Sequence, residues 1–386
     1  MSKVRIGIIG IGNMGSKHAL SCLSDKTPEI KLAAVADLSA NRRQWAKDNL
    51  PEQVNIFDSA ETLINSGLCD AVLIATPHYF HPPLSMLAFS KGLHVICEKP
   101  AGVYTKQVRE MNAAANNSGL VFGMMFNQRT NCVYRKMREL VHSGELGQIK
   151  RVNWIITDWY RSQAYYDSGG WRATWEGEGG GVLLNQCPHN LDLLQWICGM
   201  PSSVHAFCHN GKWHNVEVED DVTAYLEYTN GATGVFVTTT ADYPGTNRFE
   251  ITLDYGKLVS EGSDSLTLYK LAKSERELCF ETKEGFPKFE YETIDVKTDG
   301  ENPQHTGVIN AFAGKILHGT PLVADGTEGI DGLTLSNAMH LSSWLGKTIT
   351  LPFNEDLFYT ELKKRCASSV KKDVAGGTVF DTEGSY

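Results

Sequence analysis

The sequence contains no stretch of about 18 consecutive apolar residues, which is the length that a transmembrane helix requires. Met1-Ser2-Lys3 leads directly into an apolar run, so no secretory signal peptide is visible. There is also no internal repeat and no low-complexity tract. These absences argue against a membrane-spanning or secreted protein, and we expect a cytoplasmic one.

Clustered basic residues and paired cysteine motifs are also missing. The net charge is −9, and the Lys and Arg residues are scattered, which argues against a surface for nucleic acid or anionic membranes. The nine cysteines include no CxxC pair. Several, such as Cys97 and Cys198, lie in apolar runs that are typical of buried, reduced thiols. We therefore expect neither nucleic acid nor membrane among the partners.

The length of 386 residues favours two domains, and the apolar fraction of 42% is enough for two cores. In the first third, short apolar runs alternate with helical stretches such as Ser39–Asn49, Pro82–Ser90 and Lys106–Asn117. This alternation predicts a doubly wound parallel sheet over residues 1–127. The expected strands are Val4–Ile9, Leu32–Ala36, Val54–Phe57, Ala71–Ala75, His94–Cys97 and Val121–Phe126.

The pattern changes after residue 127, where runs of alternating residues predict a second α/β domain over residues 128–352 with a large, mostly antiparallel open sheet. A hairpin turn is expected at Thr229-Asn230-Gly231-Ala232, and helices at Val308–His318 and Gly326–Leu345. Residues 353–386 form a C-terminal extension, of which we expect about the last ten residues to be mobile. The expected strands are Gln148–Ile156, Val204–His209, Val222–Tyr228, Thr233–Thr239, Phe249–Leu253, Leu266–Leu271 and Phe289–Ile294.

A glycine motif, Gly10-Ile11-Gly12-Asn13-Met14-Gly15, separates the first apolar run from a helical stretch. Gly10 allows a tight turn, Gly12 lets the backbone approach a pyrophosphate, and Gly15 lets the helix pack against its strand. The phosphates then lie at the helix N-terminus, where unpaired N–H groups favour anions. The segment predicts a Rossmann dinucleotide-binding domain in which Gly10, Gly12, Asn13, Met14 and Gly15 contact the cofactor.

An acidic residue, Asp37, ends the second apolar run. A carboxylate at this place accepts hydrogen bonds from both ribose hydroxyls and repels a 2′-phosphate, which predicts NAD as the cofactor. Arg42 and Arg43 lie nearby in the sequence, and an arginine can bind that phosphate, so NADP stays open as the less favoured cofactor.

The strand His94–Cys97 runs into Glu98-Lys99-Pro100. Because the carboxyl ends of strands face the ligand in a doubly wound sheet, Lys99 is expected beside the nicotinamide. The alternative is a surface lysine at the start of a loop.

The second candidate segment begins at Gly179-Gly180-Gly181 and contains Asn185, His189 and Asp192. In a helix these three residues would fall at i, i+4 and i+7 on one stripe, although Pro188 argues against a regular helix through its middle. A histidine is the expected proton acceptor for the oxidation of an alcohol. A structural polar stripe is the alternative.

Four segments taken together are more specific than any single motif: Gly10–Gly15, Glu98-Lys99-Pro100, Ser143-Gly144-Glu145-Leu146-Gly147 and Gly179–Asp192. Their combination resembles the glucose–fructose oxidoreductase/inositol dehydrogenase (Gfo/Idh/MocA) family, over roughly residues 3 to 352. The resemblance implies a Rossmann domain followed by an α/β domain with an open antiparallel sheet. It also implies oxidation or reduction of one secondary hydroxyl of a sugar or cyclitol with NAD or NADP.

By this resemblance, Lys99 is the lysine of the family's E-K-P motif and His189 is the catalytic histidine. The family commonly has Asp four residues before this histidine, where this chain has Asn185. An amide can still orient a hydroxyl, so we expect Lys99, His189 and Asn185 to be the catalytic residues.

Further residues are expected around this site. Flat rings cover the C–H faces of a sugar and polar groups read its hydroxyls, which suits the aromatic and basic loop before the glycines. Packing within the loop explains these residues equally well. His78 and His81 lack a third metal ligand at a suitable spacing, so we expect no metal. His18 is interpreted as a helix-face residue that contacts the loop. The remaining cofactor candidates are Thr76, Pro77, His78, His81, Glu98, Lys99 and Asn127, and the substrate candidates are Lys99, Arg129, Tyr160, Tyr165, Trp171, Arg172, Asn185 and His189.

These observations predict an NAD-dependent dehydrogenase of a sugar, glycoside or cyclitol, with pyranose C3 as one candidate position. Two alternatives remain: a glycoside-cleaving enzyme that works by oxidation and elimination, and a non-catalytic nucleotide-sensing protein. A sheet with helices on one side leaves its other face to be covered, so we expect a homo-oligomer, a dimer or tetramer, assembled through the second domain.

Overall fold

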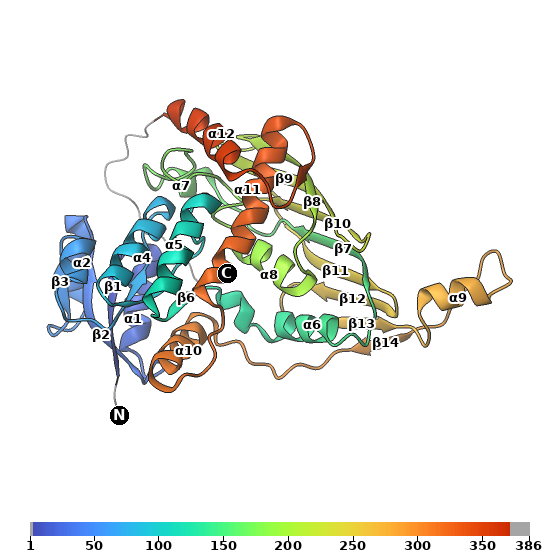
Figure 1. Ribbon diagram of the computed structural model, residues 1–386, viewed down its shortest axis with the longest axis horizontal. Coiled ribbons are helices and arrows are strands. Elements are labelled where there is room, and N and C mark those ends of the chain that lie inside the picture. Colours follow the sequence, from blue (N-terminus) through green and yellow to red (C-terminus); the bar gives the residue numbers. More distant parts are fainter. Residues whose placement is uncertain (1–2, 371–386) are drawn as a thin grey trace.

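The computed structural model describes residues 3–370 and contains two sheets (Figure 1). The first sheet is parallel throughout, in the order β3-β2-β1-β4-β5-β6. Apart from the edge strand β3, its strands are almost entirely buried because helices cover both faces, which explains their continuous apolar sequences. They are β1 (Val4–Ile9), β2 (Ile30–Ala36), β3 (Asn55–Phe57), β4 (Ala71–Ile74), β5 (His94–Cys97) and β6 (Phe122–Met124).

The helices of this Rossmann sheet alternate with its strands, as the sequence predicts. The strand order reverses between β1 and β4, which is the point where ligands bind in doubly wound folds. The helices are α1 (Asn13–Leu23), α2 (Ala40–Asn49), the short α3 (Ala60–Ile64), α4 (His81–Ser90) and α5 (Thr105–Ser118), and a 3₁₀ turn, η1 (His78–Phe80), precedes α4.

The second sheet is mixed and mostly antiparallel, in the order β14-β13-β12-β11-β7-β10-β9-β8-β15 within the described residues. Only the β7–β10 pair among its recorded strand pairs is parallel. The predicted fold class is therefore confirmed. The strands are β7 (Ile149–Ile156), β8 (Ser203–Asn210), β9 (Glu219–Glu227), β10 (Thr233–Thr239), β11 (Asn247–Leu253), β12 (Gly256–Glu261), β13 (Thr267–Lys270), β14 (Glu292–Asp295) and β15 (Ile349–Thr350).

Helices cover one face of the second sheet, on the side toward the Rossmann domain (Figure 1). They are α6 (Cys132–His142), α8 (Pro188–Cys198) and α11 (Gly329–Leu345). Helix α11 contacts β8 of the sheet, α8, and α5 of the Rossmann domain. On the covered face, Trp154 stacks on Phe249 with ring centroids 4.1 Å apart, and Phe236 packs edge-on against Trp154. These helices form the layer between the two sheets.

Two further C-terminal helices pack outside this layer, α10 on the Rossmann core and α12 against α11 and α5. Helix α10 (Gln304–His318) follows the second sheet in the sequence but packs on the Rossmann core through Val308, Ile309 and Phe312. Helix α12 (Glu355–Ala367) is joined to α5 by the Arg109–Glu355 and Lys106–Asp356 ion pairs. The C-terminal extension thus contains a helix, while the residues that we expected to be mobile lie outside the described part.

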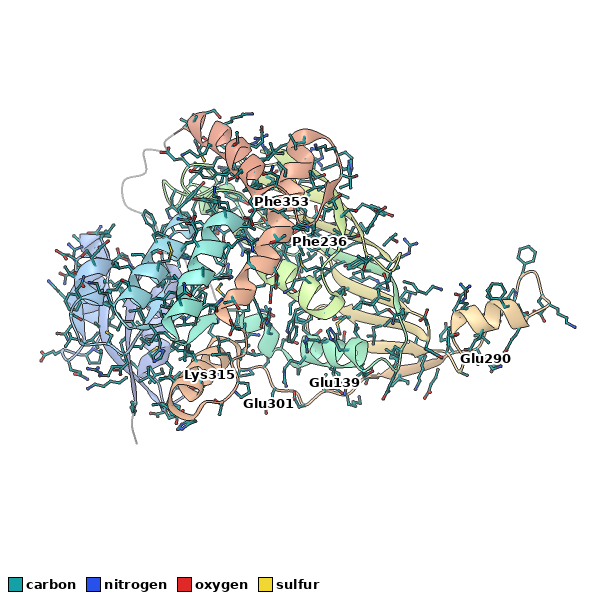
Figure 2. The ribbon with its side chains drawn as sticks, in the orientation of Figure 1. Glu139, Phe236, Glu290, Glu301, Lys315 and Phe353 are labelled. Atoms are coloured by element: carbon teal, nitrogen blue, oxygen red, sulfur yellow. The ribbon has the colours of Figure 1, made fainter. Side chains whose placement is uncertain are left out.

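Several elements differ from the sequence-based expectation. The helix expected over Gly326–Leu345 is a 3₁₀ turn, η3 (Gly326–Glu328), followed by α11, and β14 begins at Glu292 rather than Phe289. Sequence reasoning missed α6, although Asn131 caps it by accepting from the Val133 amide at 2.8 Å. It also missed α7 (Gln163–Tyr166), α9 (Glu275–Glu281), which projects from the molecule (Figures 1 and 2), and the 3₁₀ turn η2 (Asn127–Thr130).

No helix in the described part of the chain is long and apolar enough to cross a bilayer.

Candidate active site

The glycine loop between β1 and α1 is shaped by contacts within the protein. Gly10 has φ +84°, and a Cβ on Gly15 would lie 1.8 Å from the carbonyl oxygen of Gly10. A side chain at either position would therefore strain the loop. A Cβ on Gly12, in contrast, would meet no atom within 4 Å. This open space at the N-terminus of α1 suits a pyrophosphate, because the N–H groups and the dipole at a helix N-terminus favour an anion.

Asp37 follows β2 and connects to this loop. Its carboxylate accepts hydrogen bonds from the amides of Ile11, at 2.9 Å, and Ser39, at 2.8 Å. Arg42 donates from Nε to the Ile11 carbonyl at 2.6 Å, and its buried Nη2 has no partner among the described residues. Arg43 donates to the carbonyls of Asp37 and Leu38. The carboxylate and one guanidinium thus lie at the same end of the glycine loop.

Glu98, the residue before the candidate lysine, forms a buried pair with His18. The Oε1 atom of Glu98 lies 2.6 Å from Nε2 of His18. Burial by itself would raise the pKa of Glu98, but the hydrogen bond and the charge of His18 lower it to about 2. Glu98 therefore remains a carboxylate, and its Oε2 accepts from the Lys99 amide at 3.1 Å.

Lys99 is directed toward the second domain. Its Nζ donates to the Asn185 carbonyl at 2.8 Å. Burial lowers the pKa of Lys99, Glu98 opposes this shift, and the charge of Arg161 adds to it. The ammonium group keeps two further donors for a ligand.

Two histidines that follow β4, His78 and His81, contact the backbone of neighbouring loops. His81 bridges Thr76 and Pro100, with its ring nitrogens 2.7 Å from each carbonyl oxygen, and His78 Nδ1 lies 3.2 Å from the Glu178 carbonyl. Pro77 precedes η1. The two histidines therefore hold the loops in place through their rings.

Two polar atoms of the predicted cofactor set are buried without a partner among the described residues, Thr76 Oγ1 and Asn127 Oδ1. The amide nitrogen of Asn127 donates to Gln304. Because a buried polar atom without a partner is costly, both oxygens fit contacts to a bound dinucleotide. Asn13 and Met14 lie in the first turn of α1, beside the open space at Gly12.

His189 lies in the first turn of α8, with Pro188 as the first helical residue. Its side chain is buried, and its Nδ1 has no partner among the described residues. Burial lowers the pKa of His189 well below the ordinary value, and the charge of Lys99 acts in the same direction. The imidazole is therefore neutral at neutral pH, as a proton acceptor must be.

Asn185 lies in the turn before α8, so the helical stripe of Asn185, His189 and Asp192 is wrong. Proline fits the first turn of a helix but not its interior, and the helix therefore begins at Pro188. The Asn185 amide instead donates to the Glu178 carboxylate and, at 3.3 Å, to the Tyr165 hydroxyl. Only its backbone carbonyl contacts Lys99.

Glu178 is a buried carboxylate in this region that sequence reasoning missed. It also accepts from the Ala173 amide at 2.5 Å. Burial raises its pKa, while the charge of Arg172 lowers it. Its position directly before the glycine triplet was visible in the sequence, but the return of Asn185 toward it depends on the fold of residues 173–185.

The substrate candidates divide into two groups. The Tyr165 hydroxyl accepts from Arg172 at 2.8 Å and lies 3.3 Å from the amide nitrogens of Asn185 and Gln186. Trp171 packs edge-on against His78, with ring centroids 5.7 Å apart. These residues therefore adjoin the Lys99 region.

Arg129 and Tyr160 form the second group, which has no hydrogen bond to Tyr165 or Lys99 among the described residues. Arg129 is buried and binds the Asp192 carboxylate at 2.7 and 2.8 Å, and a second carboxylate, Glu328, also contacts it. Tyr160 is 46% exposed and packs on Tyr243. The guanidinium of Arg129 thus binds carboxylates of the protein itself rather than standing open to a substrate.

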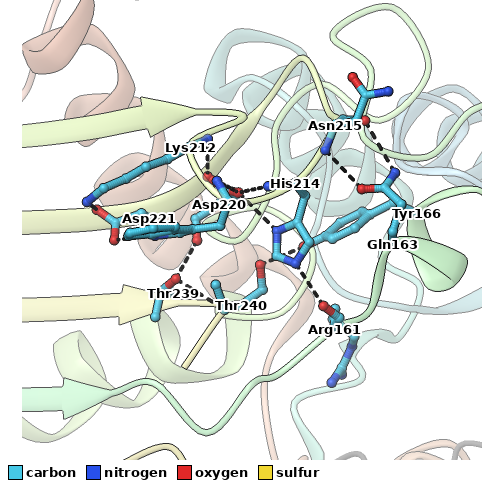
Figure 3. Close-up of polar contacts among 12 residues, drawn as sticks. Arg161, Gln163, Tyr166, Lys212, His214, Asn215, Asp220, Asp221, Thr239 and Thr240 are labelled. Carbon is cyan, nitrogen blue, oxygen red and sulfur yellow. Dashed lines mark hydrogen bonds and ion pairs between the residues drawn. The ribbon is translucent and has the colours of Figure 1, made fainter. Parts of the chain in front are cut away.

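A polar network fixes the loop that carries Arg161 (Figure 3). Buried Asp220 accepts from His214 Nδ1 at 2.9 Å and from three backbone amides of the 212–214 turn. His214 Nε2 lies 2.9 Å from the Arg161 carbonyl, and the Arg161 amide donates to Thr240. In Figure 3 the Arg161 side chain extends away from this network.

No group of three or more His, Cys, Asp or Glu side chains in the described part of the chain is arranged to hold a metal ion.

Comparison with known proteins finds a family match for each of the two domains. Residues 4–126 match the model of the GFO/IDH/MocA oxidoreductase family, NAD-binding Rossmann fold, and residues 134–259 match the GFO/IDH/MocA C-terminal domain. The WlbA dehydrogenase of Bordetella pertussis, solved with NADH and UDP-GlcNAcA, has the same fold. Its TM-score is 0.77 at 24% identity, over 91% of this chain and 100% of that one.

Two curated relatives are 27% identical to this chain. One is a D-glucoside 3-dehydrogenase of Escherichia coli, aligned over 60% of this chain and 68% of the relative. The other is an inositol 2-dehydrogenase of Corynebacterium glutamicum, aligned over 52% of this chain and 56% of the relative. The chain belongs to the GFO/IDH/MocA family of oxidoreductases.

Proposed function

We propose that this protein oxidises a secondary hydroxyl of a sugar, glycoside or cyclitol with NAD. The observation that carries the proposal is the approach of two elements from different domains. Lys99 at the end of β5 reaches the turn before α8, and α8 holds a buried, neutral His189 in its first turn. A cationic donor whose charge acts on a neutral acceptor suits alcohol oxidation.

Each residue has a separate task in this reaction. The nicotinamide of NAD, when bound, supplies the hydride acceptor. His189 takes the hydroxyl proton onto its imidazole, and Lys99 donates a hydrogen bond to the same oxygen as negative charge develops there. Glu98 holds the backbone amide of Lys99, while Asn185 holds its ammonium group. Both contacts reduce the freedom of the lysine before the substrate binds.

NAD is proposed as the cofactor because the Asp37 carboxylate lies at the glycine loop, where it would repel a 2′-phosphate. Arg42 already donates to the Ile11 carbonyl, although its Nη2 remains available. Steady-state comparison of kcat/KM for the two cofactors decides this point. A clear preference for NADP would mean that Arg42 binds the phosphate and outweighs Asp37.

A panel of sugars, glycosides and inositols with NAD, followed by product analysis, tests the reaction. The relatives that act on a glucoside and an inositol support these substrate classes. NADH formation with a ketonic product is the expected result. Release of an aglycone without net NADH would instead indicate oxidation, elimination and return of the hydride. Binding of NAD with no turnover of any compound would favour a nucleotide sensor.

We also propose a homo-oligomer formed through the uncovered face of the second sheet. That face carries exposed Ile155, Phe207 and Tyr225 on β7, β8 and β9. The pairing Ile155–Val237–Thr223–Phe207 places the first and last of these in one row across four strands. An apolar row on an open sheet face suits burial against a second copy.

A further inference from the structure

Two arginine side chains enclose Tyr165 from different parts of one loop region. The guanidinium carbon of Arg172 lies 4.5 Å from the centre of the Tyr165 ring, and that of Arg161 lies 5.3 Å from it. Arg172 also donates to the Tyr165 hydroxyl at 2.8 Å. Both arginines are half-buried. Tyr165 therefore keeps two guanidinium groups close together against their mutual repulsion.

Neither arginine forms an ion pair with a carboxylate among residues 3–370. The polar partners recorded for their side chains are uncharged, the Tyr160 carbonyl for Arg161 and the Tyr165 hydroxyl for Arg172. Arg129 shows the contrast, because its buried guanidinium contacts two carboxylates. The charges of Arg161 and Arg172 thus lack the direct neutralisation that a partly buried guanidinium usually has.

This pair adjoins the proposed reaction centre. The Tyr165 hydroxyl lies 3.3 Å from the amide nitrogen of Asn185, whose carbonyl accepts from Lys99. Trp159, whose ring faces Arg161, donates from Nε1 to Asn190 at 3.0 Å, and Asn190 follows His189 directly. The two arginines therefore belong to the same region as both candidate catalytic residues.

The local charge is positive in excess. Lys99 adds a third cation, and its pKa is lowered by burial and by the charges of Arg161 and Arg172. Two buried carboxylates are near these cations. Glu98, beside Lys99, already binds His18 and the Lys99 amide. Burial raises the pKa of Glu178, and its oxygens are occupied by the Ala173 amide and the Asn185 side chain. Asp158 lies within range of the Arg161 charge without forming an ion pair, and burial raises its pKa too. An anionic ligand group would balance this charge.

The backbone of Arg161 is also fixed in advance. Its amide donates to Thr240 and its carbonyl lies 2.9 Å from His214, which Asp220 holds from the other side (Figure 3). A guanidinium on a fixed backbone loses less freedom when a ligand binds.

We propose that Arg161 and Arg172 form a subsite for an anionic group, so that the substrate is a carbohydrate bearing a carboxylate or a phosphate. The inference rests on the proposed oxidation and narrows its substrate class. Two guanidinium forks match the planar or tetrahedral oxygens of either group. The hydroxyl to be oxidised then lies at Lys99 and His189, on another carbon of the same molecule.

Matched substrates test the subsite. Oxidation with NAD is measured for methyl glucoside, methyl glucuronide and glucose 6-phosphate, which differ in charge but share a pyranose ring. The expected kcat/KM is at least about tenfold higher for one of the two anionic compounds than for the neutral one, as one charge-assisted contact discriminates on that order. Whichever anion is preferred identifies the carboxylate or the phosphate as the group bound.

Substitution shows whether the arginines are responsible. In Arg161→Gln and Arg172→Gln, the ratio of kcat/KM for the anionic over the neutral compound should fall about tenfold or more. Arg172→Lys retains the charge, so its ratio should fall less than that of Arg172→Gln. This difference separates a loss of charge from misfolding of the glutamine variant. Arg276→Gln on the projecting helix α9 is the control and should keep both activity and ratio.

The outcomes separate the two proposals. The anionic subsite would be overturned if neutral sugars were oxidised as fast as anionic ones and the ratio of kcat/KM for the anionic over the neutral compound were unchanged in both glutamine variants. The dehydrogenase proposal would still stand. Failure to oxidise or bind any carbohydrate would remove both. Titration of the NADH-bound protein with D-glucuronate, D-glucose 6-phosphate and D-glucose, followed by tryptophan fluorescence, gives a second readout. Binding of an anionic sugar that weakens with salt and is lost in Arg172→Gln supports the subsite.

Discussion

Lys99 is the residue whose surroundings in the structure differ most from those of an ordinary surface lysine. Its backbone amide is held by Glu98, and its ammonium group by the Asn185 carbonyl. The sequence predicts its location from the strand before it, because a strand end in a doubly wound sheet faces the ligand. The contact to Asn185 could not be predicted, since it joins residues 86 positions apart.

Lys99→Ala should reduce turnover on the order of 100-fold, as removal of one donor to a developing oxyanion does. NADH affinity, measured by fluorescence titration, should change much less, because the lysine is proposed to act on the substrate oxygen. Equal losses in NADH affinity and in turnover would assign the lysine to the cofactor. Near-normal turnover would remove it from the reaction.

Arg129 is better explained by stability than by substrate binding. Removing it leaves Asp192 buried without its cation, which costs about 3–5 kcal/mol for a buried pair. Arg129→Ala should therefore lower the free energy of unfolding by this amount in urea denaturation. Arg109→Ala, which breaks the more exposed pair with Glu355, is the control and should cost about 1 kcal/mol or less. Unchanged stability combined with a large loss in kcat/KM would restore the substrate role.

At the scale of elements, strands were easier to predict than the loops that carry the site. The apolar runs of β1, β4 and β5 are continuous because both faces of the Rossmann sheet are covered. The stripe of Asn185, His189 and Asp192 required a helix that includes Asn185. Pro188, which argued against a regular helix there, is the first residue of α8. Glu178 was missed because no periodic pattern connects it to Asn185.

The glycine loop provides a matched pair of variants. Gly15→Ala places a Cβ against the Gly10 carbonyl and should destabilise the fold by about 2 kcal/mol or more, besides weakening NADH binding. Gly12→Ala meets no protein atom, so it should leave the melting temperature unchanged and raise the Kd for NADH about tenfold, or about 1.4 kcal/mol. Unchanged NADH affinity in Gly12→Ala would contradict the placement of the pyrophosphate.

At the scale of the whole molecule, the two sheets are connected by a shared helical layer. Helix α11 contacts elements of both domains, and Asn337 on it bonds the backbone of Val103 and Thr105 at 3.0 and 3.1 Å. Periodicity predicted this helix but not its position between the domains. That position depends on contacts between distant parts of the chain.

The uncovered face of the second sheet predicts a homo-oligomer. Light scattering at micromolar concentration should give a dimer or tetramer, and Phe207→Asp should shift it toward the monomer because it places a charge in the apolar row. Phe280→Asp on α9, which changes a still more exposed ring outside the sheet, should leave the mass unchanged. A monomeric wild-type protein would contradict the proposed interface.

The central claim is that a neutral, buried His189 accepts the proton during oxidation, and the pH profile of kcat/KM tests it most directly. A base acts in its neutral form, and burial lowers the pKa of His189 well below its ordinary value of about 6.5. Activity should therefore rise with pH only on the acid side of 6.5 and remain level through neutrality. It should fall again at alkaline pH, below the ordinary lysine value, as Lys99 loses its proton. His189→Ala should lose the acid limb together with most of the rate, whereas a His189→Ala variant that keeps both would contradict the account.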